Sequence, residues 1–199
     1  MDIPETTGHY DTLNRLVRTT NNGETTEYRY DNAGNRFIKF SPEATTVYLR
    51  HGQIAVAMDI EVNADQTTEK GTINRYVLSG DLLAGRVTTT VPATGDPVVE
   101  KSWYHLYRNC YGSFCQTEMR SISVDHLNST KCITDASGTI VVNYIYRAFG
   151  EQLKRLDTSG NETGDEAKYS YGGKELDEVT NLYYFNARYY DATIGRFIN

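Results

Sequence analysis

A four-residue turn signature, Asp-x-x-Gly, recurs along the chain between short runs of residues that favour β-strands. One copy spans Asp31 to Gly34 and separates the strand-like runs at residues 26–30 and 36–40. Asp at the first position of a type I turn accepts hydrogen bonds from its own backbone, and Gly at the fourth position adopts the left-handed conformation. The pattern therefore closes a β-hairpin with a bulge. The same signature, in one case with Asn in place of Gly, lies at residues 11–14, 135–138 and 157–160.

The runs between these turns predict an all-β fold. They are short and alternate in hydrophobicity; examples are residues 45–49, 74–78, 139–146 and 182–185. Strands separated by turn signals about every 8–12 residues are typical of antiparallel β-structure. The chain is also rich in Tyr, with 16 Tyr against six Phe and one Trp, and Tyr favours the pleated, half-buried surface of a sheet. A helical pattern fits only at residues 174–179, where we expect one turn.

Two of the turns belong to a longer repeat. The pair Tyr-Asp lies at residues 10–11 and again at 30–31, 20 residues later, and an Arg follows each pair, at Arg15 and Arg36. A period of about 20 to 50 residues marks arrays whose units cannot bury their apolar faces alone and must pair with their neighbours. We therefore expect consecutive antiparallel β-hairpins in one curved sheet.

The composition argues against several classes of protein. A net charge of −6 and a pI near 5.2 argue against nucleic acid as a partner, because phosphate binding needs a basic face. No stretch approaches the run of about 18 apolar residues that a membrane helix needs, and we expect no signal peptide in this chain. The three cysteines are too few and odd in number for a disulfide framework. Cys110 and Cys115 are either a pair across a loop or, as we favour, two free thiols, and Cys132 is the third.

The motifs resemble those of a known family. Tyr-Asp-x-x-Gly-Asn-Arg at residues 30–36 resembles the tyrosine–aspartate (YD) repeat of Rhs proteins. Four later segments resemble the Rhs repeat-associated core in sequence and in order: residues 125–130, 144–151, 171–177 and 182–198. The resemblance implies a YD-repeat segment over residues 1–124 and a core segment over residues 125–199 that continues the same sheet.

The residues that carry this resemblance are expected to have structural roles. They are Tyr10, Asp11, Tyr30, Asp31, Gly34, Asp125, His126, Asp135, Gly138, Gly150, Ala187, Arg188, Tyr189, Tyr190, Asp191, Gly195 and Arg196. Two features depart from the family. Asn128 stands where the family usually has Gly, and residues 106–123 resemble an insertion without a family role.

The resemblance implies a function for the chain. Rhs proteins are large bacterial toxins, secreted or held at the cell surface, whose YD repeats form a β-shell around a variable C-terminal toxin. This chain is therefore expected to be a shell segment that encloses and helps to deliver the toxin. Its partners would be the toxin and the rest of the parent protein. The resemblance implies no enzymatic activity of its own and no cofactor or metal.

Three catalytic or metal-binding interpretations compete with this structural one. Asp125, His126 and Ser129 invite a hydrolytic triad, but neighbouring side chains on a strand point to opposite faces and do not converge. The turn Asp residues are isolated, unlike the grouped ligands of a calcium loop. The histidines are scattered along the chain and lack the spacing of a zinc site. In Rhs relatives an aspartyl autoprotease motif follows the Gly-Arg-Phe segment. Its Asp-Pro element is absent here, so an Asp177–Asp191 pair is a less favoured alternative.

A further alternative is a module that binds carbohydrate or the cell surface. Tyr183 and Tyr184 could offer an aromatic platform for a glycan. We favour cross-strand tyrosine ladders instead, with nearby arginines on the ring faces or paired with turn aspartates. A chain of this length also leaves open sheet edges, so we expect self-association or pairing with other parts of the parent protein.

Overall fold

The computed structural model describes most of the chain. The described residues are 7–51, 55–63, 71–80, 82–91, 116–164, 167–177, 179–186 and 188–198. Cys110, Cys115, Ala187 and residues 106–115 of the expected insertion lie outside these ranges, and residues 116–123 belong to a strand.

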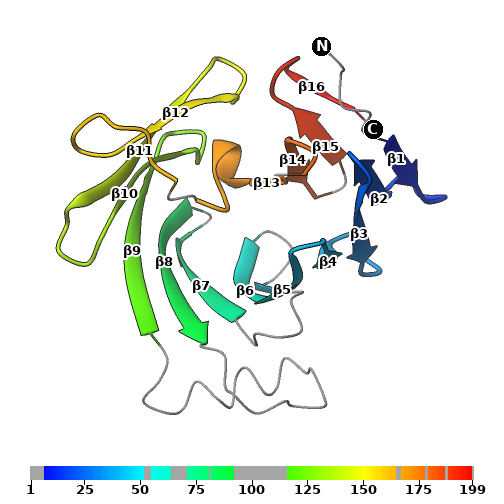
Figure 1. Cartoon of the computed structure of the whole chain (residues 1–199), viewed down its shortest axis with the longest axis horizontal. Helices are drawn as coiled ribbons and strands as arrows, with labels where there is room; N and C mark the ends of the chain where they lie inside the picture. Colours follow the sequence, from blue (N-terminus) through cyan, green and yellow to red (C-terminus); the bar gives the residue numbers. More distant parts are fainter. Residues whose placement is uncertain are drawn as a thin grey trace.

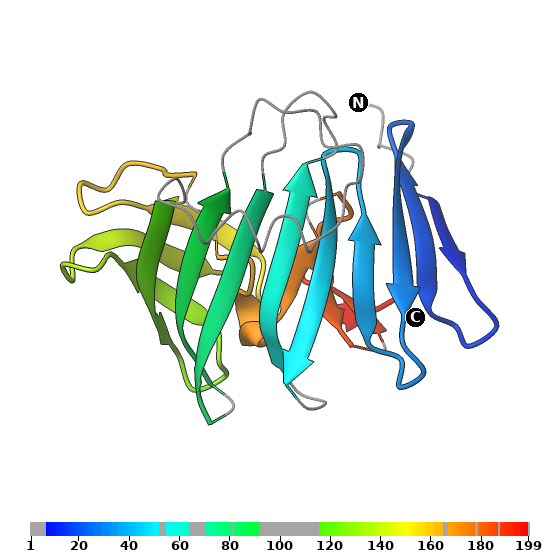
Figure 2. The same ribbon diagram turned by 90° about the horizontal axis from the view of Figure 1, so that it is seen from below.

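Twelve strands form one long sheet in chain order, and each is antiparallel to the next (Figures 1 and 2). The strands are β1 (Thr7–Tyr10), β2 (Leu16–Asn21), β3 (Glu24–Tyr30), β4 (Arg36–Phe40), β5 (Ala44–His51), β6 (Ala55–Asn63), β7 (Gly71–Ser79), β8 (Leu82–Val91), β9 (Gln116–Val124), β10 (Thr130–Thr134), β11 (Ile140–Tyr146) and β12 (Gln152–Leu156). Figure 1 shows that this sheet curves as an open arc from β1 to β12. The expected curved sheet of consecutive hairpins is confirmed.

A second, smaller sheet lies on the concave side of the long one (Figure 1). Its strands are β13 (Glu175–Asp177), β14 (Leu182–Phe185), β15 (Arg188–Asp191) and β16 (Arg196–Phe197). A short 3-10 helix, η1 (Tyr171–Gly173), precedes it. The expected single sheet therefore holds only as far as β12. Beyond it, the tyrosine-rich strands bury their rings by folding back onto the long sheet rather than extending it.

The helical turn expected at residues 174–179 is wrong. Residues 175–177 are extended and pair with β14, with Glu175 opposite Tyr184. The physical reason is the alternation of Glu175 and Asp177, which points both carboxylates toward the long sheet in an extended strand, as the next section describes. A 3-10 turn lies just upstream instead, at η1.

The Asp-x-x-Gly turns have the hydrogen bonds that the sequence predicts. Asp31 Oδ1 accepts the backbone N–H groups of Ala33 at 2.9 Å and Asn35 at 2.8 Å, and the Gly34 N–H donates to the Asp31 carbonyl at 3.0 Å. Gly34 has a φ of 82°, and a register shift between β3 and β4 marks the bulge. Turns with the same backbone and carboxylate bonds begin at Asp11, Asp125, Asp135 and Asp157. The turns thus set the register of the strands in the long sheet.

Three apolar clusters hold the structure together. One lies among the later strands of the long sheet: Leu83, Ile122, Ile133, Val142, Tyr144 and Ala167. The second joins the two sheets: Leu16, Tyr28, Tyr184 and Tyr189. The third lies in the small sheet: Tyr183, Tyr190 and Ala192. The second cluster is the apolar contact that fixes the small sheet against the early strands of the long one. In the described part of the chain, no helix has the length and apolar character to cross a membrane.

Candidate functional site: the polar interior between the two sheets

A buried arginine lies where the two sheets meet. Arg36 begins β4, directly after the Asp31 turn, and its side chain is 1% exposed. Its guanidinium carbon lies 4.3 Å from the centre of the Tyr184 ring, 5.0 Å from that of Tyr48 and 5.3 Å from that of Tyr28. Aromatic faces attract a cation, and this attraction grows when water is excluded. Arginine–tyrosine stacking was expected, and here it spans both sheets.

Two carboxylates of β13 neutralise this arginine. Arg36 Nη2 lies 2.7 Å from Glu175 Oε2, and Arg36 Nη1 lies 3.7 Å from Asp177 Oδ2. Asp177 Oδ2 is also 3.3 Å from Lys39 Nζ. Tyr48 Oη donates to Glu175 at 2.7 Å, and Tyr28 Oη donates to Asp177 at 2.9 Å. A buried charge is costly unless it is paired and hydrogen-bonded, and both acids meet this condition. We name Arg36, Lys39, Glu175 and Asp177 the inter-sheet charge cluster.

The electrostatics of the cluster shift the pKa values of Glu175 and of its neighbour Tyr28 away from neutral pH. Burial alone would raise the pKa of Glu175, but the charges of Arg36, Lys168 and Lys39 outweigh burial and lower that pKa to about 2. Burial and the charge of Asp177 raise the pKa of Tyr28. A general acid or base needs a pKa near the working pH, and these shifts move both groups away from it. The cluster is suited to holding the sheets together rather than to proton transfer.

A second buried pair fixes the segment that leads into η1. Lys168 Nζ lies 3.3 Å from Asp59 Oδ1 on β6, and Asp59 is fully buried. Asp59 also accepts hydrogen bonds from Asn74 Nδ2 at 2.9 Å and Tyr76 Oη at 2.6 Å. The Lys168 ammonium lies 5.1 Å from the centre of the Tyr48 ring. These contacts attach the connection between β12 and β13 to the middle of the long sheet.

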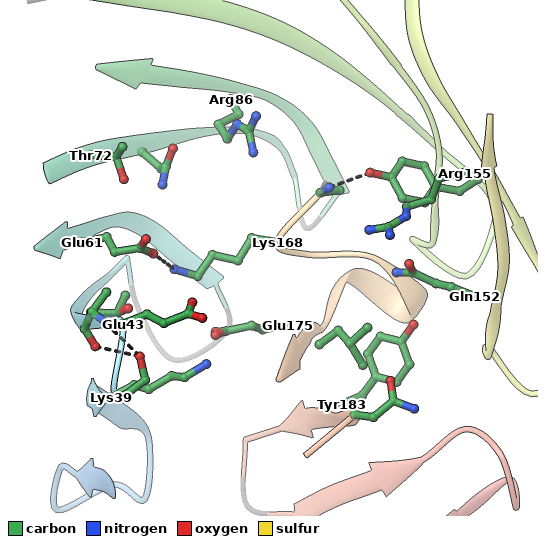
Figure 3. A pocket seen from close by; sticks show the side chains of 18 of the residues that line it. Lys39, Glu43, Glu61, Thr72, Arg86, Gln152, Arg155, Lys168, Glu175 and Tyr183 are labelled. Carbon is green, nitrogen blue, oxygen red and sulfur yellow. Dashed lines mark hydrogen bonds and ion pairs between the residues drawn. The ribbon is translucent and has the colours of Figure 1, made fainter. Parts of the chain in front are cut away.

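A hollow of about 850 Å³ lies between the two sheets (Figure 3). Four acidic and four basic residues line it: Glu43, Glu61, Glu151 and Glu175, and Lys39, Arg86, Arg155 and Lys168. Figure 3 shows Lys39 and Glu61 on one side of the space and Arg155 on the other. Because the two signs balance, the lining favours neither an anionic nor a cationic ligand. In the part of the chain that the structure describes, no group of three or more His, Cys, Asp or Glu residues is arranged to hold a metal.

The structure does not assemble the triad suggested by residues 125–129. The Asp125 carboxylate accepts the backbone N–H groups of Leu127 and Ser129. The His126 side chain is exposed, and the buried Ser129 hydroxyl accepts the N–H of Gly172 at 3.0 Å. Each side chain thus has its own local role.

The alternative aspartate pair is also not formed. Asp177 is fully buried in the inter-sheet charge cluster, whereas Asp191 accepts the backbone N–H of Thr193 at 2.8 Å within its own turn. Gly195 ends that turn with a φ of 66°. The two carboxylates therefore serve separate contacts.

The tyrosines considered for glycan contact lie inside the molecule. Tyr183 is 1% and Tyr184 is 4% exposed. Tyr183 pairs with Tyr190 across the strands, and Tyr184 pairs with Tyr189, as the ladder interpretation predicts. Tyr183 Oη donates to the Gly150 carbonyl at 3.0 Å, so the small sheet is also tied to the β11–β12 turn. A ring that stacks on a sugar must be exposed, and both of these rings are buried. They therefore do not form a platform for a glycan.

Arg15 also has the partners expected of it, whereas Arg188 stacks on a phenylalanine ring rather than on a tyrosine. Arg15 pairs with Asp11 at 2.7 Å and lies 5.0 Å from the centre of the Tyr30 ring. Arg188 lies 3.8 Å from the centre of the Phe197 ring. Sequence reasoning missed the roles of Glu175, Asp177, Asp59 and Lys168. The sequence does carry a signal for Glu175 and Asp177, since these acidic residues alternate within a tyrosine-rich, strand-forming segment.

Comparisons with known proteins agree with the sequence motifs. The family model for the RHS Repeat matches residues 10–39. A tRNA3(Ser)-specific nuclease WapA of Bacillus spizizenii is 28% identical over 193 residues, which cover 96% of this chain and 7% of that protein. A salivary gland surface protein 1 of Aedes aegypti is 33% identical over 86 residues, which cover 43% of this chain and 2% of that protein.

Solved structures show the same fold. The TcdB2-TccC3 crystal structure superposes with a TM-score of 0.69 at 19% identity, over 96% of this chain and 9% of that one. The Tc holotoxin pore of Photorhabdus luminescens gives a TM-score of 0.66 at 19% identity, over 96% of this chain and 8% of that one. The chain therefore spans less than a tenth of the length of these proteins.

Proposed function

Since this chain belongs to the Rhs (YD-repeat) family, we propose that it is a wall segment of a larger Rhs-type toxin. In this role it encloses a C-terminal toxic domain, helps to deliver it and is not itself catalytic. The wall is the long sheet, and the small sheet lines its concave side. The parent protein would be secreted or held at the bacterial cell surface, and the partners of this segment would be the rest of the parent and its toxin.

One observation carries this proposal: the inter-sheet charge cluster fixes the small sheet inside the curve of the long one. Arg36 of a YD-repeat turn contacts Glu175 of the core segment at 2.7 Å, with both side chains almost fully buried. Repeat and core thus fold as one unit, and their contact faces the interior. This is the arrangement that a wall with an inner lining requires.

The free edges of the long sheet support the same role. β1 begins the strand order and has no strand on its outer side among the described residues. β12 ends the strand order, and its outer side is paired only near its end, through the bridge between Leu156 and Glu162. All four residues of β1 are exposed. An unpaired edge is a template for another strand. We propose that β1 and β12 pair with neighbouring strands of the parent wall.

Limited proteolysis of the parent protein tests the enclosure. We expect the C-terminal domain to resist protease in the wild type and to become accessible in the Arg36→Met variant, because that variant loosens the lining from the wall. The Arg18→Met variant is the matched control, since Arg18 pairs with Glu27 on the surface at 2.7 Å. A C-terminal domain that is cleaved equally fast in all three proteins would contradict the proposal.

Incubation with tRNA tests the absence of catalysis in this segment. The WapA relatives carry the name of a nuclease, and the segment matched here is 7% of their length. We expect the 199-residue chain to leave tRNA intact under conditions in which a full-length Rhs nuclease cleaves it. Cleavage that persists in a highly purified chain would contradict the proposal.

A further inference from the structure

A second, smaller cavity lies between β5, β7 and the segment around η1. Its volume is about 100 Å³. Arg36, Arg50 and Lys174 are the cations among the described residues that line it, and Glu175 is the carboxylate. Glu175 is already bound by Arg36 and by Tyr48 Oη, each at 2.7 Å. The cavity lining therefore carries an excess of positive charge.

Three hydrogen-bond donors that line this cavity lack an acceptor. The Nε atoms of Arg36 and Arg50 and the Oη of Tyr169 are buried, and they have no hydrogen-bond partner among the described residues. The Arg36 side chain is 1% exposed. Guanidinium nitrogens only donate, so the missing group must be an acceptor. A buried donor without an acceptor is unfavourable, so an acceptor bound in the cavity would stabilise these groups.

The surroundings of Lys174 also favour an anion in this cavity. Burial and the nearby charge of Arg50 both lower the pKa of Lys174. Its ammonium lies 5.5 Å from the centre of the Phe185 ring, at the half-buried side of the cavity. Two cations that approach each other repel, and a bound anion between them would remove this repulsion.

We propose that this cavity binds one small tetrahedral oxyanion of the phosphate or sulfate class, held by Arg50, Lys174 and Tyr169. The size of the cavity limits the ligand to a small ion, because drug-sized ligands occupy pockets of about 300–1,000 Å³. Because Arg36 is paired with Glu175, the two remaining cations of the lining, Arg50 and Lys174, match a dianion. Arginine forms strong, charge-assisted hydrogen bonds to such oxyanions. A water molecule would satisfy the donors but would leave the excess charge unbalanced.

Calorimetric titration of the 199-residue chain with sodium phosphate, at constant ionic strength, tests the site. We expect saturable binding of one phosphate per chain. Arg50→Met and Lys174→Met should each weaken it by about 30-fold or more, because each removes a charged partner from a largely desolvated site. Lys154→Met is the matched control, since Lys154 is exposed on β12 and should leave binding unchanged. Absence of binding in the wild type, or equal binding in all variants, would overturn the proposal.

Thermal unfolding gives a second test, because the stability of the Lys174→Met variant relative to the wild type should depend on whether phosphate is present. In phosphate-free buffer, Lys174→Met should unfold at a higher temperature than the wild type, because it removes the repulsion from Arg50. With phosphate, the wild type should gain stability and the Lys174→Met variant should not. A loss of stability in Lys174→Met without phosphate would overturn the assignment of Lys174.

A crystal soaked in selenate provides the direct image of the site. The expected result is one anomalous peak between Arg50 and Lys174. A water molecule at that position, with no anomalous signal, would overturn the proposal.

Discussion

Replacement of Arg36 by Met is the sharpest perturbation of this molecule. The substitution keeps much of the side-chain volume but removes the cation that contacts Glu175 at 2.7 Å and three tyrosine rings. It leaves a buried carboxylate without its closest positive partner. Loss of one member of a buried ion pair costs about 3–5 kcal/mol. For a chain of this size, such a loss lowers the midpoint of thermal unfolding by about 6–20 °C.

A surface pair in the same sheet provides the comparison. Arg18 and Glu27 also lie 2.7 Å apart, but their side chains are 51% and 28% exposed. An exposed pair contributes about 0–1 kcal/mol, so Arg18→Met should have little effect on the free energy of unfolding. The two arginines make contacts of equal length, and only their burial and tyrosine contacts differ.

Urea unfolding followed by far-UV circular dichroism measures both variants. Combining Arg36→Met with Glu175→Gln completes a double-mutant cycle. We expect the double variant to lose less than the sum of the two single losses, by about 0.5–3 kcal/mol, because each single variant leaves the other member of the pair buried without its partner, and the double variant does not. An Arg36→Met variant within 1 kcal/mol of Arg18→Met would refute the view that the inter-sheet charge cluster holds the two sheets together.

Three other predictions address the same contacts. Folding lowers the pKa of Glu175 from 4.5 to about 2, so its stabilising effect is complete above pH 4.5 and is lost as the pH falls toward 2. The full loss in the free energy of unfolding is about 3 kcal/mol. In a pH series of urea unfolding, the free energy of the Glu175→Gln variant should therefore change less over this range than that of the wild type. Parallel pH curves for the two proteins would contradict this prediction. Gly150→Ala should destabilise more than Gly138→Ala, by about 1–3 kcal/mol in urea unfolding, because a Cβ at Gly150 would clash with the Tyr171 ring, whereas one at Gly138 meets nothing within 4 Å. Equal losses would show that the left-handed φ, 92° and 85° respectively, is the whole effect. Light scattering should show that the 199-residue chain self-associates as its concentration rises, because β1 has no outer partner among the described residues and β12 is paired on its outer side only near its end. A stable monomer at high concentration would count against this.

The hairpins could be predicted from the sequence because their turns depend on local chemistry. The carboxylate of Asp31 binds the backbone of residues within the same turn, and Gly34 takes a left-handed φ. The same logic covers Asn128, which stands where the related motif has Gly. Its φ of 65° shows that it adopts the left-handed conformation, which Asn tolerates better than most residues.

The second sheet could not be predicted because it depends on contacts between distant parts of the chain. Residues 171–198 are as strand-like as the earlier hairpins, so their sequence alone suggested a continuation of the wall. What separates them is the burial of Tyr184 and Tyr189 against Tyr28 and Arg36 of the long sheet. The expected helical turn at residues 174–179 failed for the same reason, since Glu175 pairs with an arginine far away in the sequence.

The central claim concerns how this segment lies in its parent protein. Electron cryo-microscopy of the full-length parent tests it most directly. We predict that β1 and β12 each pair with a further strand, that the long sheet continues into a closed wall, and that the small sheet and the C-terminal domain lie inside it. A map in which β1 and β12 remain open to solvent, with the C-terminal domain outside the curve of the sheet, would contradict the account.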